Sequence, residues 1–240
     1  MGWAIAMFAE EVANYSELRG MHRSGGLGYG PLAAIERHCH NPSLTMETGC
    51  GASTVLMSNI SPRHYAFCFD DRIYPTGSVN FVTESPLYRA TRSTFVFGPT
   101  QQTLPSFQFD DPIDFALIDG PHAFPFPELE YYTIYPRLKV GAVLALDDVH
   151  IPTIHNLFRF LSDDVMFEPL ERIANLALFR RTDTPTFSPL SDGWEYQEYN
   201  RRRFPVVGRE DRWQRLVPEW LRHLFPPTTR AAVKRFLSRD

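Results

Sequence analysis

The stretch that decides the fold is Ser43-Leu44-Thr45-Met46-Glu47-Thr48-Gly49-Cys50-Gly51-Ala52-Ser53-Thr54. A short apolar run ends at an acid, two glycines follow, and small hydroxyl residues come next. This order predicts a buried strand, a tight turn and the start of a helix, the arrangement with which α/β proteins bind nucleotide-like ligands. Gly49 and Gly51 allow a sharp turn and the close approach of a ligand to the backbone. The N–H groups at the start of the helix suit an anionic group such as a carboxylate.

The glycine pattern does not identify the ligand by itself. A dinucleotide-binding fingerprint has Gly or Ala three residues after its second glycine, and this chain has Thr54 there. A glycine turn that binds no ligand therefore remains an alternative, and the segments that follow must decide.

The bulk properties are those of an ordinary globular protein. The chain has 240 residues, of which 43% are hydrophobic and 22% charged, so it is long enough for one α/β domain with extensions. No apolar run reaches membrane-spanning length, and the N-terminus is a poor signal peptide. The three cysteines are scattered, without disulfide or zinc spacing. We therefore expect a cytoplasmic protein.

Strand and helix patterns alternate along the middle of the chain. The expected strands are 44–47, 65–69, 94–97, 113–118, 140–146, 165–170 and 176–180, and the expected helices between them are 53–59, 79–90, 128–138 and 153–161. Strands alternating with helices predict a parallel, doubly wound sheet. The expected fold class is therefore α/β, with a mostly parallel, seven-stranded, Rossmann-like sheet.

Two extensions flank this sheet. Residues 1–40 form the first: a helix at 3–19, a glycine-rich segment at 20–30 that is either a lid over the ligand or a plain linker, and a helix of about eight residues from Pro31. Residues 41–181 are the expected sheet domain. Residues 182–240 are a linker followed by a basic amphipathic tail.

The tail differs in charge from the rest of the chain. Residues 201–240 hold eleven Arg and Lys against four Asp and Glu, while the whole chain has a net charge of −4. Its apolar side chains at 213–224 fall at helical spacing, interrupted by Pro218. Packing on the main domain or on a second subunit is the first interpretation, and it favours a homo-oligomer. Contact with an anionic membrane surface is the second, and nucleic-acid binding is not expected.

Acids follow the ends of four expected strands: Glu47, Asp70-Asp71, Asp119 and Asp147-Asp148. Ligands of open α/β sheets lie beyond the carboxyl ends of the strands, where the strand order reverses. One such acid is usually a helix cap or a turn former. Four sets at one edge point instead to a binding site.

The spacing of these acids predicts their roles. Asp70 lies nineteen residues after Gly51, a spacing at which an acid meets ribose hydroxyls, with Asp71 as its substitute. Asp119, Asp147 and Asp148 follow neighbouring strands and repel one another unless a cation is present. Oxygen ligands favour Mg²⁺, with Ca²⁺ or Mn²⁺ as alternatives. The competing interpretation is that Asp148 caps the next helix and that Asp119 forms a hydrogen bond within its own turn.

Two histidines adjoin this acidic group. His122 comes three residues after Asp119, and its neutral pKa suits it to take a proton from a substrate hydroxyl. His150 is the reserve candidate. A lone loop histidine is more often only a surface residue, so the assignment of His122 as catalytic base depends on the acids beside it.

Three motifs together resemble the class I S-adenosylmethionine-dependent methyltransferases, most of all the small bacterial branch of metal-dependent sugar and natural-product O-methyltransferases. They are residues 47–54, Ile118-Asp119-Gly120-Pro121-His122, and 135–141 leading to Asp147-Asp148. The resemblance covers about residues 40–180. Cys50, Pro121, the segment 124–127 and the tail depart from it.

The resemblance implies a cofactor, S-adenosylmethionine, and a role for each matching residue. The implied cofactor-binding residues are Glu47, Gly49, Gly51, Ser53, Asp70, Thr100 and Asp119. Thr100 falls where the family contacts the adenine. The implied metal ligands are Asp119, Asp147 and Asp148, and His122 is the implied base.

The expected function is methyl transfer to a hydroxyl of a small molecule, with a sugar as one acceptor class and a divalent metal as helper. A metal-independent methyltransferase of the same fold is the first alternative. An inactive cofactor-binding or scaffold protein that acts through its basic tail is the second. A related hydroxylase and a nucleic-acid methyltransferase are more remote, and the latter predicts salt-sensitive binding by the tail.

Overall fold

The computed structural model describes residues 27–186, 194 and 197–203. The predicted helix at 3–19, most of the glycine-rich segment and the apolar stripe at 213–224 lie outside the described residues. The chain forms two compact units, one of Met1–Ser162 with Met166–Thr186 and one of Asp163–Val165 with Phe187–Asp240. In the second unit, residues 198–203 are helical, and Arg203 forms an ion pair with Asp163.

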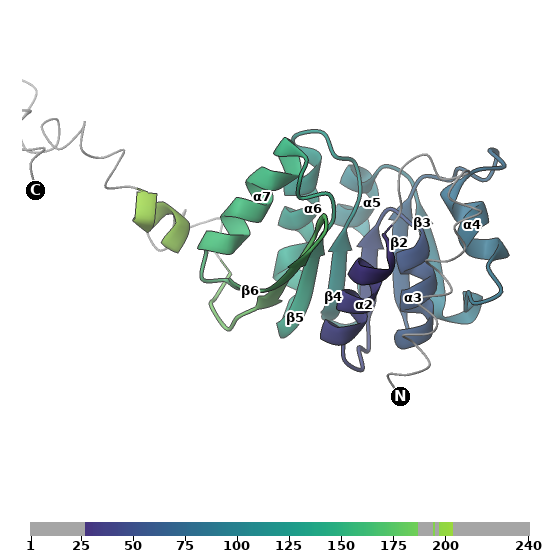
Figure 1. The fold of residues 1–240 in the computed structure, drawn as a ribbon, viewed down its shortest axis with the longest axis horizontal. Helices are drawn as coiled ribbons and strands as arrows, with labels where there is room; N and C mark the ends of the chain where they lie inside the picture. The colour runs from purple at the N-terminus through teal and green to yellow at the C-terminus, as the bar shows by residue number, and fades with distance from the viewer. Residues whose placement is uncertain (1–26, 187–193, 195–196, 204–240) are drawn as a thin grey trace, which may run out of the picture. The chain divides into compact units, whose positions relative to one another are not determined.

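The first unit is built on one seven-stranded sheet with the order β3-β2-β1-β4-β5-β7-β6 (Figure 1). Its strands are β1 (Thr45–Thr48), β2 (His64–Cys68), β3 (Ser93–Phe97), β4 (Ile113–Ile118), β5 (Leu138–Leu146), β6 (Phe167–Ile173) and β7 (Leu176–Arg181). The first five strands pair in parallel, and β7 is antiparallel to both β5 and β6. The strand order reverses between β1 and β4, so β1 stands at the switch point of the sheet.

Helices cover both faces of the sheet (Figure 1). They are α2 (Tyr29–His38), α3 (Ala52–Ile60), α4 (Ser78–Glu84), α5 (Thr100–Ser106), α6 (Phe126–Ile134) and α7 (Pro152–Asp163), with 3₁₀ turns η2 (Ala90–Arg92) and η3 (Tyr135–Arg137). The helix α3 contacts α2 and α4, and α6 contacts α5. Tyr131 of α6 packs edge-on against Phe160 of α7.

The alternation of side chains along the central strands explains the two helical layers. Phe115 and Leu117 of β4 join Val143 and Ala145 of β5 in one buried cluster with residues of α2 and α3. The intervening residues Ala116, Ile118, Leu144 and Leu146 are also buried, because successive side chains of a strand point to opposite faces. Strands buried on both faces are typical of parallel sheets covered by helices. The predicted doubly wound, mostly parallel sheet is therefore confirmed.

Two helices differ from the sequence-based expectation. No helix was predicted after the third strand, yet α5 occupies Thr100–Ser106. It has only one buried apolar residue, Leu104, and contains Pro105. The sequence therefore lacks the apolar periodicity that would predict a helix there. The helix expected at 79–90 ends at Glu84, because Pro86 disfavours the helical conformation of Ser85. Among the described residues, no helix combines the length and apolarity needed to cross a bilayer.

Candidate active site

The end of β1 sends two neighbouring side chains into different layers of the fold. Glu47 and Thr48 are both buried, and as consecutive strand residues they point to opposite faces. Glu47 bonds to residues of α3, whereas the Thr48 hydroxyl donates to Glu130 of α6 at 2.8 Å. The strand at the switch point thereby connects the two helical layers directly below the glycine turn.

Gly49 lies in a conformation that few other residues adopt. Its φ is +84°, and a Cβ built on it would overlap the backbone carbonyl oxygen of Asp119. The turn after β1 therefore packs against the turn after β4 through bare backbone. Gly51 is different, since a Cβ there would meet no described atom within 4 Å. The first glycine serves chain packing, and the second faces open space.

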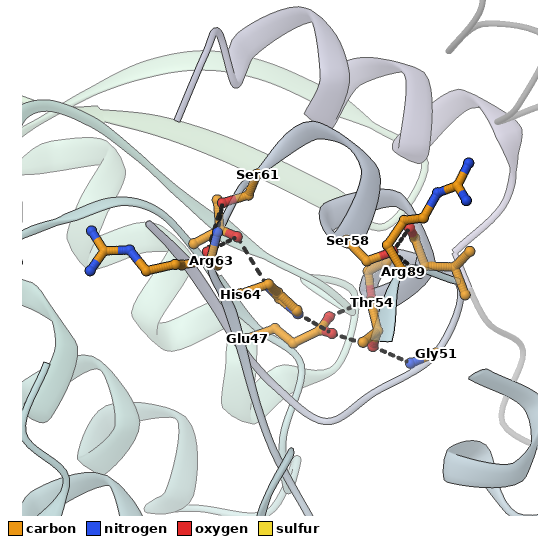
Figure 2. A network of polar contacts seen from close by, with 11 residues as sticks. Glu47, Gly51, Thr54, Ser58, Ser61, Arg63, His64 and Arg89 are labelled. Atoms are coloured by element: carbon orange, nitrogen blue, oxygen red, sulfur yellow. Dashed lines mark hydrogen bonds and ion pairs between the residues drawn. The ribbon is translucent and has the colours of Figure 1, made fainter. Parts of the chain in front are cut away.

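Glu47 is the centre of a buried polar network (Figure 2). Its carboxylate accepts hydrogen bonds from the hydroxyls of Ser53, at 2.5 Å, and Thr54. The Thr54 hydroxyl oxygen accepts the N–H of Gly51 at 2.9 Å. Two residues predicted to bind the cofactor, Glu47 and Ser53, are thus bonded to each other, and the network holds the glycine turn against the first turn of α3.

The acids after β2 have separate roles. Asp70, the predicted ribose ligand, is exposed and forms a bidentate ion pair with Arg72 at 2.7 and 2.5 Å. This hydrogen bonding from Arg72 lowers the pKa of Asp70. Asp71 instead accepts the backbone N–H groups of Ser78 and Val79 at 2.5 and 3.0 Å. Asp71 therefore caps α4, and Asp70 is the acid of this pair that reaches solvent.

Glu130 is a buried carboxyl that the sequence analysis missed. It is only 2% exposed, and it accepts hydroxyls from Thr48 and from Thr100 at 2.7 Å. A Cβ on Gly120 would overlap its carboxyl group. Burial raises the pKa of Glu130 to about 7, against the two hydroxyl bonds that lower it. Thr100, predicted to contact the adenine, thus has its side chain turned inward to Glu130.

A candidate metal site lies at the carboxyl edge of β4 and β5. Asp119, His122 and Asp148 offer ligand atoms that all lie within 4.8 Å of one another. His122 Nε2 is 3.8 Å from Asp119 Oδ1 and 3.5 Å from Asp148 Oδ2. Of the predicted ligands, Asp119 and Asp148 come together with the predicted base, while the third predicted ligand, Asp147, lies outside this group.

Asp147 and Asp148 are consecutive in the chain but differ in their surroundings. Asp147 is 8% exposed, its N–H donates to the Ile118 carbonyl at 3.1 Å, and burial raises the pKa of its carboxyl. Asp148 has a φ of +54°, a left-handed conformation that Asp tolerates better than most residues. Its carboxylate lies between His122 and His150, whose Nδ1 is 3.6 Å from Asp148 Oδ1.

The charged groups in this cluster shift one another's pKa values. Burial, with the nearby Asp147 carboxyl, raises the pKa of Asp119 to about 7, while His122 opposes the shift. The neighbouring carboxylates, Asp119 first, raise the pKa of His122, while partial burial opposes the shift. A cation bound between these acids would relieve the same repulsion. Shifted titration at a strand edge is a common mark of a functional site.

Cys50 is inert. A hydrogen bond with Cys68, together with burial, raises the pKa of the Cys50 thiol. A protonated thiol is a poor nucleophile. This departure from the family pattern therefore adds no covalent chemistry to the turn.

Comparison with known proteins agrees with this geometry. Residues 46–149 match a family model described as a methyltransferase domain. This match supports the resemblance of the segment to the class I, S-adenosylmethionine-dependent methyltransferases. No curated protein sequence matches the chain. The matched residues run from β1 to the loop after β5, and so they include the glycine turn and the acidic cluster.

Solved structures share the fold of this chain. A putative O-methyltransferase from Klebsiella pneumoniae is 15% identical, with a TM-score of 0.57 over 72% of this chain and 89% of its own. TomG, an O-methyltransferase from Streptomyces achromogenes solved with SAM, is 14% identical, with a TM-score of 0.55 over 72% and 89%. A putative caffeoyl-CoA O-methyltransferase from Staphylococcus aureus is 13% identical, with a TM-score of 0.56 over 72% and 91%. At these identities the likeness shows the fold.

Proposed function

We propose that this protein is a methyltransferase that transfers the methyl group of S-adenosylmethionine to a hydroxyl oxygen of a small molecule, with a divalent cation at the acceptor side. The observation that carries the proposal is the grouping of Asp119, His122 and Asp148 within 4.8 Å beside a glycine turn that touches the Asp119 backbone. A donor site and an acceptor site then share one edge of the sheet.

The chemistry needs an aligned oxygen and an acceptor for one proton. The acceptor oxygen attacks the methyl carbon, an O–C bond forms as the C–S bond breaks, and the products are a methyl ether, S-adenosylhomocysteine and a proton. His122, with 42% of its side chain exposed, would take that proton. Alignment of the reacting atoms is worth up to roughly 7–11 kcal/mol in favourable cases.

The donor set of the acidic cluster fits a hard divalent cation. Asp119 and Asp148 supply carboxylate oxygens, and Mg²⁺ and Mn²⁺ bind through such oxygens. When bound, the cation supplies positive charge that lowers the pKa of an acceptor hydroxyl. Asp119 and Asp148 would hold it, and the buried Asp147 would support the site through its charge.

The donor half of the site rests on the turn after β1. The open space at Gly51 and the N–H groups at the start of α3 suit the amino-acid end of the cofactor. Asp70, exposed at the end of β2, would bind the ribose hydroxyls. The acceptor class is a sugar or another small hydroxylated molecule.

Three measurements test the proposal. Calorimetry should detect binding of S-adenosylhomocysteine, and a panel of hydroxylated sugars and phenols should yield a methyl ether by mass spectrometry. EDTA should abolish turnover, and Mg²⁺ or Mn²⁺ should restore it. Absence of cofactor binding would overturn the proposal, and tight binding without turnover on any acceptor would favour the scaffold function.

A metal-independent transferase is the second candidate. Its supporting observation is that His122 Nε2 lies 3.8 and 3.5 Å from two carboxylates, which can orient the ring without a cation. In this case the acids shape the pocket and orient the base. Activity that survives EDTA separates this candidate from the metal-dependent one.

A further inference from the structure

His64 is a fully buried histidine that the mechanism above does not use. It is the first residue of β2, and it lies directly opposite Thr45 in the parallel pairing of β1 and β2. Its side chain has no exposed surface. Its Nδ1 is 3.0 Å from the Thr45 hydroxyl, and its Nε2 is 3.1 Å from a Glu47 carboxylate oxygen. Figure 2 shows the ring between Ser61 and Arg63 on one side and Glu47 on the other.

The bonding fixes one hydrogen of the ring. An ionised carboxylate only accepts hydrogen bonds, so the Nε2 of His64 donates to Glu47. The same carboxylate oxygen accepts the Thr54 hydroxyl, and the other oxygen accepts the Ser53 hydroxyl. Glu47 therefore has three donors in a site that is 1% exposed, as a buried carboxylate requires.

This network leads from the interior of the sheet to the glycine turn. From His64 it passes through Glu47 to Thr54, and the Thr54 hydroxyl oxygen holds the N–H of Gly51. The N–H groups of Ala52 and Ser53 precede the first bond of α3, which Val55 makes to Gly51 at 3.3 Å. The orientation of these amides therefore depends on a carboxylate that His64 holds in place (Figure 2).

We infer that His64 is a positioning residue for the cofactor-binding turn, acting through Glu47. The inference rests on the proposed function, since it assigns the donor site to that turn. It also changes the role of Glu47: the carboxylate organises the backbone that meets the amino-acid end of the cofactor, and does not contact the cofactor itself. Without the imidazole, Glu47 keeps only its hydroxyl donors and must turn, which loosens Gly51 and the start of α3.

A merely structural role for His64 makes a different prediction. A buried side chain that only fills the core changes the stability of the fold and leaves the affinity of the folded protein for its ligand unchanged. A positioning residue changes the affinity for the cofactor in protein that remains folded, and a side chain that donates from the same place restores it. Cofactor affinity and thermal stability must therefore be measured on the same variants.

The variants are His64→Leu, which removes both ring nitrogens, and His64→Gln, whose amide N–H can replace the Nε2 donor. Leu178→Ala is the matched control, because Leu178 is buried to the same degree (1% exposed) in β7, a strand that pairs with β5 and β6. Thr45→Val removes the Nδ1 partner and the longer contact of the same hydroxyl with the Arg63 carbonyl, at 3.4 Å, so it serves if His64→Leu does not fold. Each is titrated with S-adenosylhomocysteine by calorimetry, its Tm is recorded, and KM for S-adenosylmethionine is compared with kcat.

We expect His64→Leu to raise the Kd for S-adenosylhomocysteine on the order of 10-fold, with a matching rise in KM and a smaller change in kcat. His64→Gln should recover most of the affinity, Thr45→Val should lose less than His64→Leu, and Leu178→Ala should lower the Tm at unchanged Kd. Wild-type affinity for S-adenosylhomocysteine in folded His64→Leu overturns the inference. If His64→Leu fails to fold, wild-type affinity in Thr45→Val overturns it. An equal loss of affinity in Leu178→Ala overturns it as well. A wild-type protein that binds no S-adenosylhomocysteine overturns the proposed function instead.

Discussion

Glu47 and Thr48 are consecutive in the chain, yet each completes a polar network on its own side of the sheet. Glu47 holds the hydroxyls of α3, and Thr48 joins Glu130 to the N–H of Asp119 through its hydroxyl, at 2.8 and 3.0 Å. Two buried carboxyls thereby fix the two turns that form the candidate site. Consecutive side chains of a strand point to opposite faces of the sheet, and this alternation directs Glu47 to one helical layer and Thr48 to the other.

The two glycines of the turn give the first prediction. Gly49→Ala should destabilise the fold by about 1–3 kcal/mol, because the new Cβ overlaps the Asp119 carbonyl and the residue keeps a φ of +84°. Gly51→Ala should leave the stability within about 1 kcal/mol of wild type, yet weaken S-adenosylhomocysteine binding, because its methyl group enters the space beside the turn. Denaturant unfolding and calorimetry check both. Unchanged affinity in Gly51→Ala would place the cofactor elsewhere.

Glu130 gives the second prediction. Its pKa of about 7 lies above the ordinary 4.5, so the folded protein binds this proton more tightly than the unfolded chain. Its contribution to stability is therefore full below about pH 4.5 and is lost as the pH rises through about 7. Glu130→Gln should remove this loss, which is at most about 3 kcal/mol. Urea unfolding at pH 5 and pH 8 measures the difference.

The control for Glu130 is Thr133→Val on the same helix. The Thr133 hydroxyl donates to the Leu129 carbonyl of α6 at 3.0 Å, so its removal should leave the pH dependence as in wild type. The Glu130 prediction would be wrong if Glu130→Gln lost as much stability between the two pH values as wild type does.

At the residue level, the sequence predicted the acids of the candidate site but not the side chains that bond to them. Glu47, Asp119 and Asp148 were singled out because they follow strands, and strand ends can be read from apolar runs. His64 and Glu130 were missed, because their significance comes from the register of β1 against β2 and from the docking of α6. Neither is visible in one-dimensional spacing. The same limit made Ser53 and Thr100 look available to a ligand, although both hydroxyls donate to buried carboxylates.

At the scale of elements, the acidic cluster is assembled by two loops. Asp119 and His122 come from the loop between β4 and α6, and Asp148 comes from the loop between β5 and α7. The two strands are paired in parallel, with Ile118 opposite Leu146, so both loops leave the same edge of the sheet. Parallel pairing therefore brings Asp148 to Asp119 and His122, which come from a loop far from it in the sequence.

This cluster gives the third prediction, on the pH dependence of metal binding. Asp119 has a pKa of about 7, raised chiefly by burial, so a cation must displace a proton below that pH. Affinity for Mn²⁺ should therefore fall as the pH drops from 8 to 6, by up to about tenfold per unit below pH 7 for one proton. Calorimetry at the two pH values measures it. Asp148→Asn should weaken binding at both, and a pH-independent affinity would contradict the prediction.

Elements with a strong apolar signal were predicted, and those held by other forces were not. The seven strands appear within a few residues of their expected positions because their buried side chains form apolar runs. The helix α5 was missed because Leu104 is its main buried apolar anchor, while Thr100 attaches its first turn to Glu130. A helix docked by a polar bond has no periodic signature. The predicted helix and stripe in the two extensions lie outside the described residues.

At the scale of the whole molecule, the turns after β1 and β4, the proposed donor and acceptor halves of the site, meet through the backbone. Gly49 packs on the Asp119 carbonyl, and the Thr48 hydroxyl accepts the Asp119 N–H at 3.0 Å. A ligand that orders the turn after β1 must therefore also restrict the turn after β4. Binding of cofactor and binding of cation should be coupled with the same factor in both directions.

Thermal unfolding of the whole chain tests this coupling as the fourth prediction. S-adenosylhomocysteine at about 100 times its Kd should stabilise the protein by about 2.7 kcal/mol, and Mn²⁺ at a similar multiple should do the same. With both ligands, the gain should exceed the sum of the two, because each binds a site that the other has already ordered. Thr48→Val removes the hydroxyl that joins the Asp119 N–H to Glu130, so it should bring the combined gain back to the sum. Strictly additive gains in the wild type would show that the two turns respond independently, and the shared backbone contact would then be a matter of packing alone.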